Sequence, residues 1–166
     1  MNTRTAFAGL RGALWVLVLA PVALGQDLPD SLAVRSIAEV ESKSVERGRE
    51  VVKLIPADRV VPGDRLIYTL EVRNMSATPL DAPTVNHPVP EHMQYVADSA
   101  VGPGAAVTYS VDGGRTFERP ENLKVAAPDG GLRPAIAADY TDIRWQLKHS
   151  LKPNSVAFVR FRALVK

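Results

Sequence analysis

The segment from Val61 to Asn74 constrains the fold of this chain more than any other stretch. Pro62 and Gly63 predict a turn, because proline presets φ at one central position and glycine supplies a positive φ at the next. After the turn, apolar residues alternate with mostly polar ones; the apolar set is Leu66, Tyr68, Leu70 and Val72. Period two with one polar face is typical of a half-buried antiparallel strand. The segment therefore predicts a β fold.

Short segments with strand character recur along the rest of the 166-residue chain. The predicted strands lie at 32–41, 51–55, 80–85, 93–97, 107–111, 143–148 and 156–165, and the first is expected at a sheet edge. No stretch has a convincing helical period. Strands at this spacing are typical of a sandwich. We predict an all-β fold, an antiparallel immunoglobulin-like β-sandwich of seven to nine strands.

Two segments lack the strand pattern. Residues 42–50 are densely charged, and we interpret them as a surface loop or a single helical turn. Residues 118–139 are rich in Pro, Gly and Ala and are predicted to form the longest surface excursion. The length suits one domain with a core of ordinary size. We assign residues 26–37 to a lead-in and first strand and residues 38–166 to a single β-sandwich domain.

The first residues resemble an export signal. Arg4 and Arg11 form a sparse positive region, an apolar run covers 13–20, and Pro21 precedes small residues that end at Gly25. This order of features predicts a signal peptide over residues 1–25. A permanent membrane anchor is the alternative, but the apolar run is shorter than the roughly 20 residues that a spanning helix needs. We therefore expect a bacterial periplasmic or secreted protein with no stable membrane insertion after cleavage.

Charge and cysteine content narrow the class of partner. The chain has 20 Lys and Arg and 18 Asp and Glu, and cleavage after Gly25 would leave 18 bases against 18 acids. This balance favours neither nucleic acid nor an anionic membrane as partner. The chain has no cysteine, so neither a disulfide nor a lipid-anchored cysteine is available to it. An exported domain of this kind must rest on its hydrophobic core.

Part of the chain resembles the bacterial repeat domain called domain of unknown function eleven. The resemblance covers about residues 38–165, and its motifs lie between Val61 and Val96. Members of that family look like immunoglobulin-type sandwiches of surface and secreted proteins, and no catalytic residues are associated with the pattern. The family usually has glycine just after the asparagine, where this chain has Met75. The matching residues are Pro62, Gly63, Asp64, Tyr68, Thr69, Asn74, Pro90, Met93, Tyr95 and Val96.

A second resemblance lies in residues 110–117. They are similar to an Asp-box, the hairpin motif of sialidases and other propellers, in Ser110, Asp112, Gly114, Thr116 and Phe117. Such a hairpin is held by an Asp side chain that accepts backbone N–H groups, and the aromatic residue anchors it. Propellers carry several copies, and this chain has one. We interpret it as a structural hairpin with its tip at residues 113–114; a glycan-related site is the alternative.

Residues for catalysis or metal binding are sparse. The bases available to a nucleophile are His87, His92 and His149, and no Gly-x-Ser-x-Gly elbow, Cys-His pair or phosphate loop accompanies them. His87 and His92 are weak candidates for a copper or zinc site, because no third ligand is evident. We expect no enzymatic activity, no metal and no cofactor.

The sequence favours a noncatalytic, exported structural or protein-interaction module of the bacterial cell envelope. Its expected partner is another envelope or extracellular protein. The alternative is an accessory domain that binds a glycan or another small ligand through the Asp-box hairpin and residues 118–139. The side chains of Tyr68, Tyr109, Trp145 and Phe161 are expected in the core rather than on a sugar-binding platform, because they fall on the inward phase of their strands.

Overall fold

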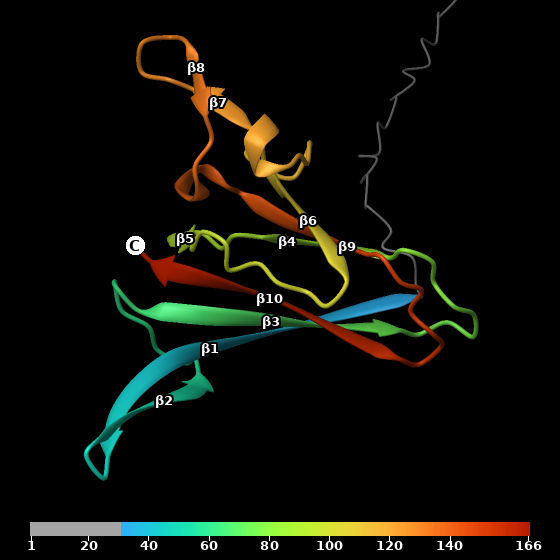
Figure 1. Cartoon of the computed structure of the whole chain (residues 1–166), viewed down its shortest axis with the longest axis horizontal. Coiled ribbons are helices and arrows are strands. Elements are labelled where there is room, and N and C mark those ends of the chain that lie inside the picture. The colour runs from blue at the N-terminus through green and yellow to red at the C-terminus, as the bar shows by residue number, and fades with distance from the viewer. Residues whose placement is uncertain (1–30) are drawn as a thin grey trace, which may run out of the picture.

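The computed structural model describes residues 31–166, and the predicted signal peptide lies outside the described residues. The described chain is mostly β with almost no helix, and its strands pair antiparallel, as predicted (Figure 1). None of its helices has the length and apolar character that a membrane span requires. The elements are β1 (Leu32–Glu46), β2 (Arg49–Pro56), β3 (Arg65–Asn74), β4 (Thr84–Pro88), β5 (Met93–Tyr95), β6 (Ala105–Ser110), η1 (Pro120–Asn122), β7 (Lys124–Ala126), β8 (Leu132–Pro134), η2 (Ala137–Asp139), β9 (Asp142–Leu147) and β10 (Val156–Val165).

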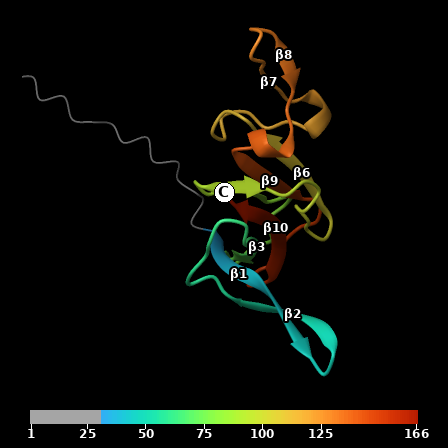
Figure 2. The same ribbon diagram turned by 90° about the vertical axis from the view of Figure 1, so that its left-hand side faces the viewer.

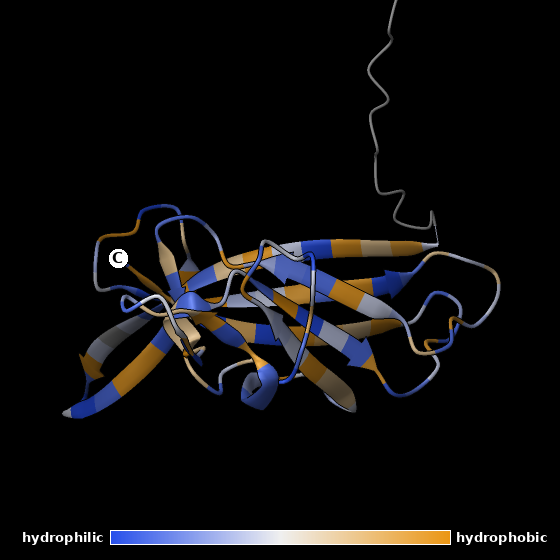
Figure 3. Cartoon of the chain, turned by 90° about the horizontal axis from the view of Figure 1, so that it is seen from above, coloured by the Kyte–Doolittle hydropathy of each residue, from blue (hydrophilic) through white to orange (hydrophobic). Residues whose placement is uncertain are grey.

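The strands form three sheets. A five-stranded sheet has the order β2-β1-β3-β10-β5, a three-stranded sheet has the order β4-β9-β6, and β7 pairs only with β8. The two larger sheets lie over one another, and the β1–β2 and β7–β8 hairpins project on opposite sides of them (Figures 1 and 2). Hydrophobic and hydrophilic residues alternate along several strands (Figure 3).

The core lies between the two larger sheets and takes residues from both. Trp145 of β9 and Phe161 of β10 are fully buried, with ring centroids 6.1 Å apart. Tyr68 stacks on Phe161 at 4.8 Å, and Tyr109 is also buried, so all four aromatic side chains expected in the core are there. The inward phase of β3, β9 and β10 was therefore predicted correctly from alternation alone.

The turn before β3 has the geometry that its sequence predicts. The N–H of Asp64 donates to the carbonyl of Val61 at 3.0 Å, and Gly63 between them has φ +97°. That φ is one that side-chain-bearing residues rarely adopt, which explains the glycine. The Asp64 carboxylate closes the turn by accepting the N–H of Val61 at 2.8 Å. β3 leaves this turn and runs between β1 and β10.

Residues 42–50 are not the predicted loop or helical turn. β1 continues to Glu46, and residues Glu39–Glu46 pair antiparallel with β2 around a turn at Arg47 and Gly48, which have φ +51° and +76°. Glu46 lies opposite Arg49 in the register and forms an ion pair with Lys53 of β2. Local charge density indicated solvation, but cross-strand pairing decided the conformation. β2 and β3 flank β1 together only at Glu39 and Val40. Residues 32–38 pair with β3 alone among the described strands, so most of the predicted strand 32–41 lies at a sheet edge, as expected.

Asn74 joins two loops at the end of β3. Its side chain is fully buried, and its Nδ2 donates to the carbonyls of Thr78 and Leu151, each at 2.8 Å. Its Oδ1 accepts the backbone N–H of Ser76 at 2.8 Å and the Ser76 hydroxyl at 2.7 Å. The Asn74 side-chain amide thus connects the loop after β3 to the segment after β9 by hydrogen bonds through both its nitrogen and its oxygen.

Replacing Asn74 with alanine should lower the free energy of unfolding by about 2–4 kcal/mol, because the carbonyls of Thr78 and Leu151 would each lose one donor and the N–H of Ser76 would lose its acceptor. Urea unfolding followed by tryptophan fluorescence measures the loss. The control is Met75→Ala at the neighbouring, 56% exposed position, which should cost less than about 0.5 kcal/mol. Equal midpoints for both variants would contradict the assigned role of Asn74.

Candidate functional site

The residues that resemble an Asp-box form a closed polar turn between β6 and η1. Asp112 Oδ1 accepts the N–H groups of Arg115 and Thr116 at 3.1 and 3.0 Å, and Oδ2 accepts the Thr116 hydroxyl at 2.7 Å. The Ser110 hydroxyl donates to Asp112 Oδ1 at 2.7 Å. The Thr116 N–H, followed by the Ser110 hydroxyl, holds the pKa of Asp112 well below its usual range. Both oxygens of the Asp112 carboxylate therefore accept hydrogen bonds from groups of the turn itself.

Glycine is required at the same turn. Gly114 has φ +79°, and a Cβ there would lie 3.2 Å from an Asp142 carboxylate oxygen. The N–H of Gly114 donates to the Ser110 hydroxyl at 3.0 Å, and the N–H of Gly113 donates to the Thr141 hydroxyl at 3.0 Å. The hairpin is therefore fastened to the start of β9 as well as to itself.

The aromatic residue of this hairpin is also engaged. The guanidinium carbon of Arg144 lies 3.7 Å from the centre of the half-buried Phe117 ring. The Arg144 Nε in turn donates to Asn86 Oδ1 at 2.8 Å. This cation–π contact occupies one face of the ring. A sugar stacked on that face would have to displace Arg144, so the contact does not favour the glycan reading.

The other motif residues serve the fold in separate places. Tyr95, on β5, is buried, and its hydroxyl meets the Tyr109 hydroxyl at 2.9 Å and accepts the N–H of Ala100 at 3.0 Å. Pro90 accepts the N–H of Met93 at 3.0 Å in the turn that leads into β5. Sequence reasoning missed Tyr140, whose ring stacks on Tyr109 at 4.5 Å. It lies between the predicted excursion at 118–139 and the predicted strand at 143–148, where no alternation marks inward positions.

The two histidines proposed as weak metal ligands have different surroundings. The His87 ring packs 5.3 Å from the Phe161 ring and 5.9 Å from the Tyr68 ring, and burial lowers its pKa. His92 is exposed in a turn with φ +62°. Within residues 31–166, no group of three or more His, Cys, Asp or Glu side chains is placed to hold a metal ion.

A different surface stands out in the hairpin that sequence reasoning did not predict. Pairing of β1 with β3 ends at Val40, and beyond it residues 41–54 form a two-stranded ribbon, called here the arm. Three apolar side chains of the arm are exposed: Val45 by 74%, Val52 by 54% and Leu54 by 42%. Cross-strand register puts them on one face, the face away from the core.

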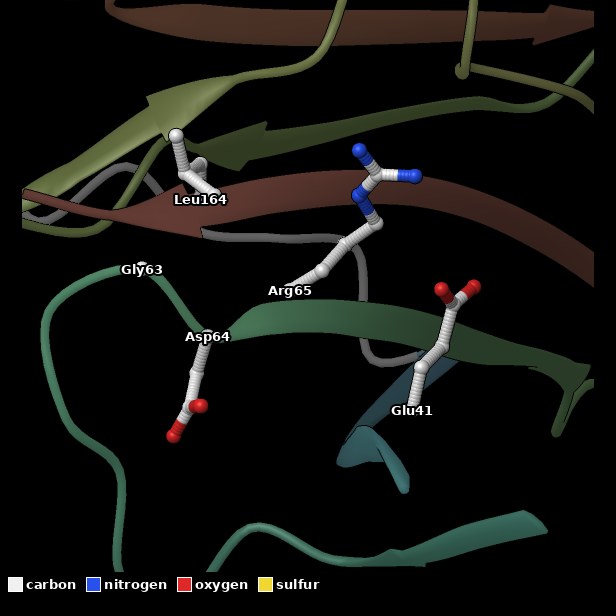
Figure 4. A pocket seen from close by; sticks show the side chains of 5 residues that line it. All are labelled: Glu41, Gly63, Asp64, Arg65 and Leu164. Atoms are coloured by element: carbon white, nitrogen blue, oxygen red, sulfur yellow. The ribbon is translucent and has the colours of Figure 1, made fainter. Parts of the chain in front are cut away.

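A small pocket lies where β1 leaves β3. It has a volume of about 280 Å³ and is lined by Glu41, Gly63, Asp64, Arg65 and Leu164 (Figure 4). The Glu41 carboxylate accepts from Arg162 Nε at 3.1 Å. The Arg65 guanidinium has no ion-pair or hydrogen-bond partner in the part of the chain that the structure describes. The pocket therefore combines a neutralised acid with an available cation.

Comparisons with known proteins identify no relative. No protein-family description, curated protein or solved structure matches the chain. The site must therefore be interpreted from its own residues.

The hydrogen bonds that the Asp112 carboxylate accepts predict that the stability of the fold depends on pH. Its pKa is lower in the folded state than the value of about 3.9 usual for an unfolded Asp, so it stabilises the fold above about pH 4. That contribution is lost progressively as the pH falls further. Asp112→Asn should therefore lower the urea midpoint at pH 7, and the difference from wild type should narrow below about pH 4. Asp58→Asn, in an exposed loop, is the control and should show no such narrowing.

Proposed function

We propose that this chain is a noncatalytic, exported module of the bacterial cell envelope that binds another protein through its arm. The observation that carries the proposal is the exposure of Val45, Val52 and Leu54 on one face of the projecting ribbon. Fully burying one such side chain yields about 1.5–3 kcal/mol. A partner protein that covers these side chains removes them from water, and the complex is stabilised by that burial.

The rest of the molecule supports a binding role rather than catalysis. The side chains of Asn74, Ser110 and Asp112 each make several hydrogen bonds, and these hold loops in place. We propose an immunoglobulin-like sandwich for the two packed sheets, in line with the resemblance to domain of unknown function eleven. The signal-like segment at residues 1–25 supports export, and the envelope is the compartment where a bacterial module of this kind would act.

Site-specific photo-crosslinking in intact cells of the native organism tests the role of the arm. A photoreactive amino acid at Val52 should give a discrete crosslinked protein species. The matched control is Leu132 on β8, which is 73% exposed and so at least as accessible as Val52 at 54%. Crosslinking that is absent at Val52, or identical at both positions, would remove the support for the arm as a binding surface. Circular dichroism confirms that both labelled proteins are folded.

A further inference from the structure

The arm has a vacant backbone edge on the side away from β2. The N–H of Ala57 donates to the carbonyl of Ala38, so even-numbered residues of β1 direct their backbone groups to the β2 side. In an antiparallel strand the backbone N–H and C=O groups of successive residues point to opposite edges. Those of the odd-numbered residues of β1 therefore point to the β3 side. β3 begins only at Arg65. The backbone N–H and C=O groups of Lys43 and Val45 therefore point to an edge without a paired strand among the described residues.

An extended peptide added at this edge can run in the same direction as β3. β3 is antiparallel to β1, and its first residue lies beside the point where the arm begins. A peptide antiparallel to the arm would start near Glu46 and finish near Glu41, directly in line with Arg65. The turn at Gly63 and Asp64 occupies the path beyond that point. A peptide in this orientation therefore fits best if its C-terminus lies beside Arg65.

The pocket at this point carries charges that suit a chain end. Figure 4 shows the Arg65 guanidinium and the Glu41 carboxylate on the same side, while the Asp64 carboxylate points away from them. Arg162 neutralises Glu41, and the N–H of Val61 engages Asp64. Arg65 is exposed and has no partner among the described side chains. A C-terminal carboxylate would supply the missing negative charge.

We propose that the arm binds the C-terminal end of an extended polypeptide as an added strand, with its terminal carboxylate on Arg65. This inference rests on the proposed function of the arm and names the chemistry of its partner. Backbone hydrogen bonds to Lys43 and Val45 supply affinity that is independent of sequence. Val45 shares the outward face with the pocket and favours an apolar side chain on the same face of the peptide.

Two synthetic peptides test the proposal: a fluorescent Lys-Val-Thr-Val-Thr-Val with a free C-terminal carboxylate, and the same peptide as a C-terminal amide. Fluorescence anisotropy should show at least tenfold tighter binding of the free acid to the wild-type chain. Arg65→Gln should remove the difference between the two peptides. Arg35→Gln changes an exposed arginine on β1 far from the pocket and should leave the difference intact.

A backbone variant separates strand addition from simple charge attraction. Val45→Pro removes an N–H that faces the vacant edge and leaves the β1–β2 pairing in place. The variant should remain folded by circular dichroism, and it should no longer bind either peptide. Equal binding of acid and amide to wild type, or a preference that survives Arg65→Gln, would overturn carboxylate capture while leaving the arm as a binding surface. Failure of the free-acid peptide to bind would also overturn carboxylate capture. The crosslinking at Val52 then tests separately whether the arm binds another protein.

Discussion

The pairing of β3 on both sides is the constraint on which the rest of the structure depends. β3 is hydrogen-bonded to β1 along one edge and to β10 along the other, so its register fixes which face of each neighbour points inward. Leu70 and Val72 on β3 are fully buried. A slip of one residue would move this apolar set to the solvent face, which explains why the alternation is so regular here.

Side-chain hydrogen bonds help to hold the loops at both ends of this strand. Asp64 closes the turn before β3, and Asn74 ties together the loops beyond its other end. Asp112 performs the same task at the β6 hairpin. Each of these residues belongs to a motif that could have been taken for a functional site. Their hydrogen bonds are directed at their own loops, and the exposed side chains of the arm lie outside all of these motifs.

The arm follows from the unequal lengths of β1 and β3. β1 extends six residues past its last pair with β3, from Glu41 to Glu46, and only β2 accompanies it there. A two-stranded ribbon cannot bury both of its faces, so Val45, Val52 and Leu54 remain exposed. Open edges of this kind attract additional strands, and natural proteins usually block them. The arm therefore combines exposed apolar side chains with an open edge, and these are the two features on which the proposed binding rests.

The sequence by itself determined the β class, the turn at Pro62 and Gly63, the strand β3, and the inward positions of Trp145 and Phe161. These are local properties, because alternation and turn chemistry are determined by neighbours along the chain. Only the tertiary structure decided that residues 42–50 form the paired ends of two strands and the turn between them, that Tyr140 stacks on Tyr109 and that Arg65 lies beside a vacant edge. Each of these depends on a partner distant in the sequence or on where a neighbouring strand ends, and no local pattern carries that information.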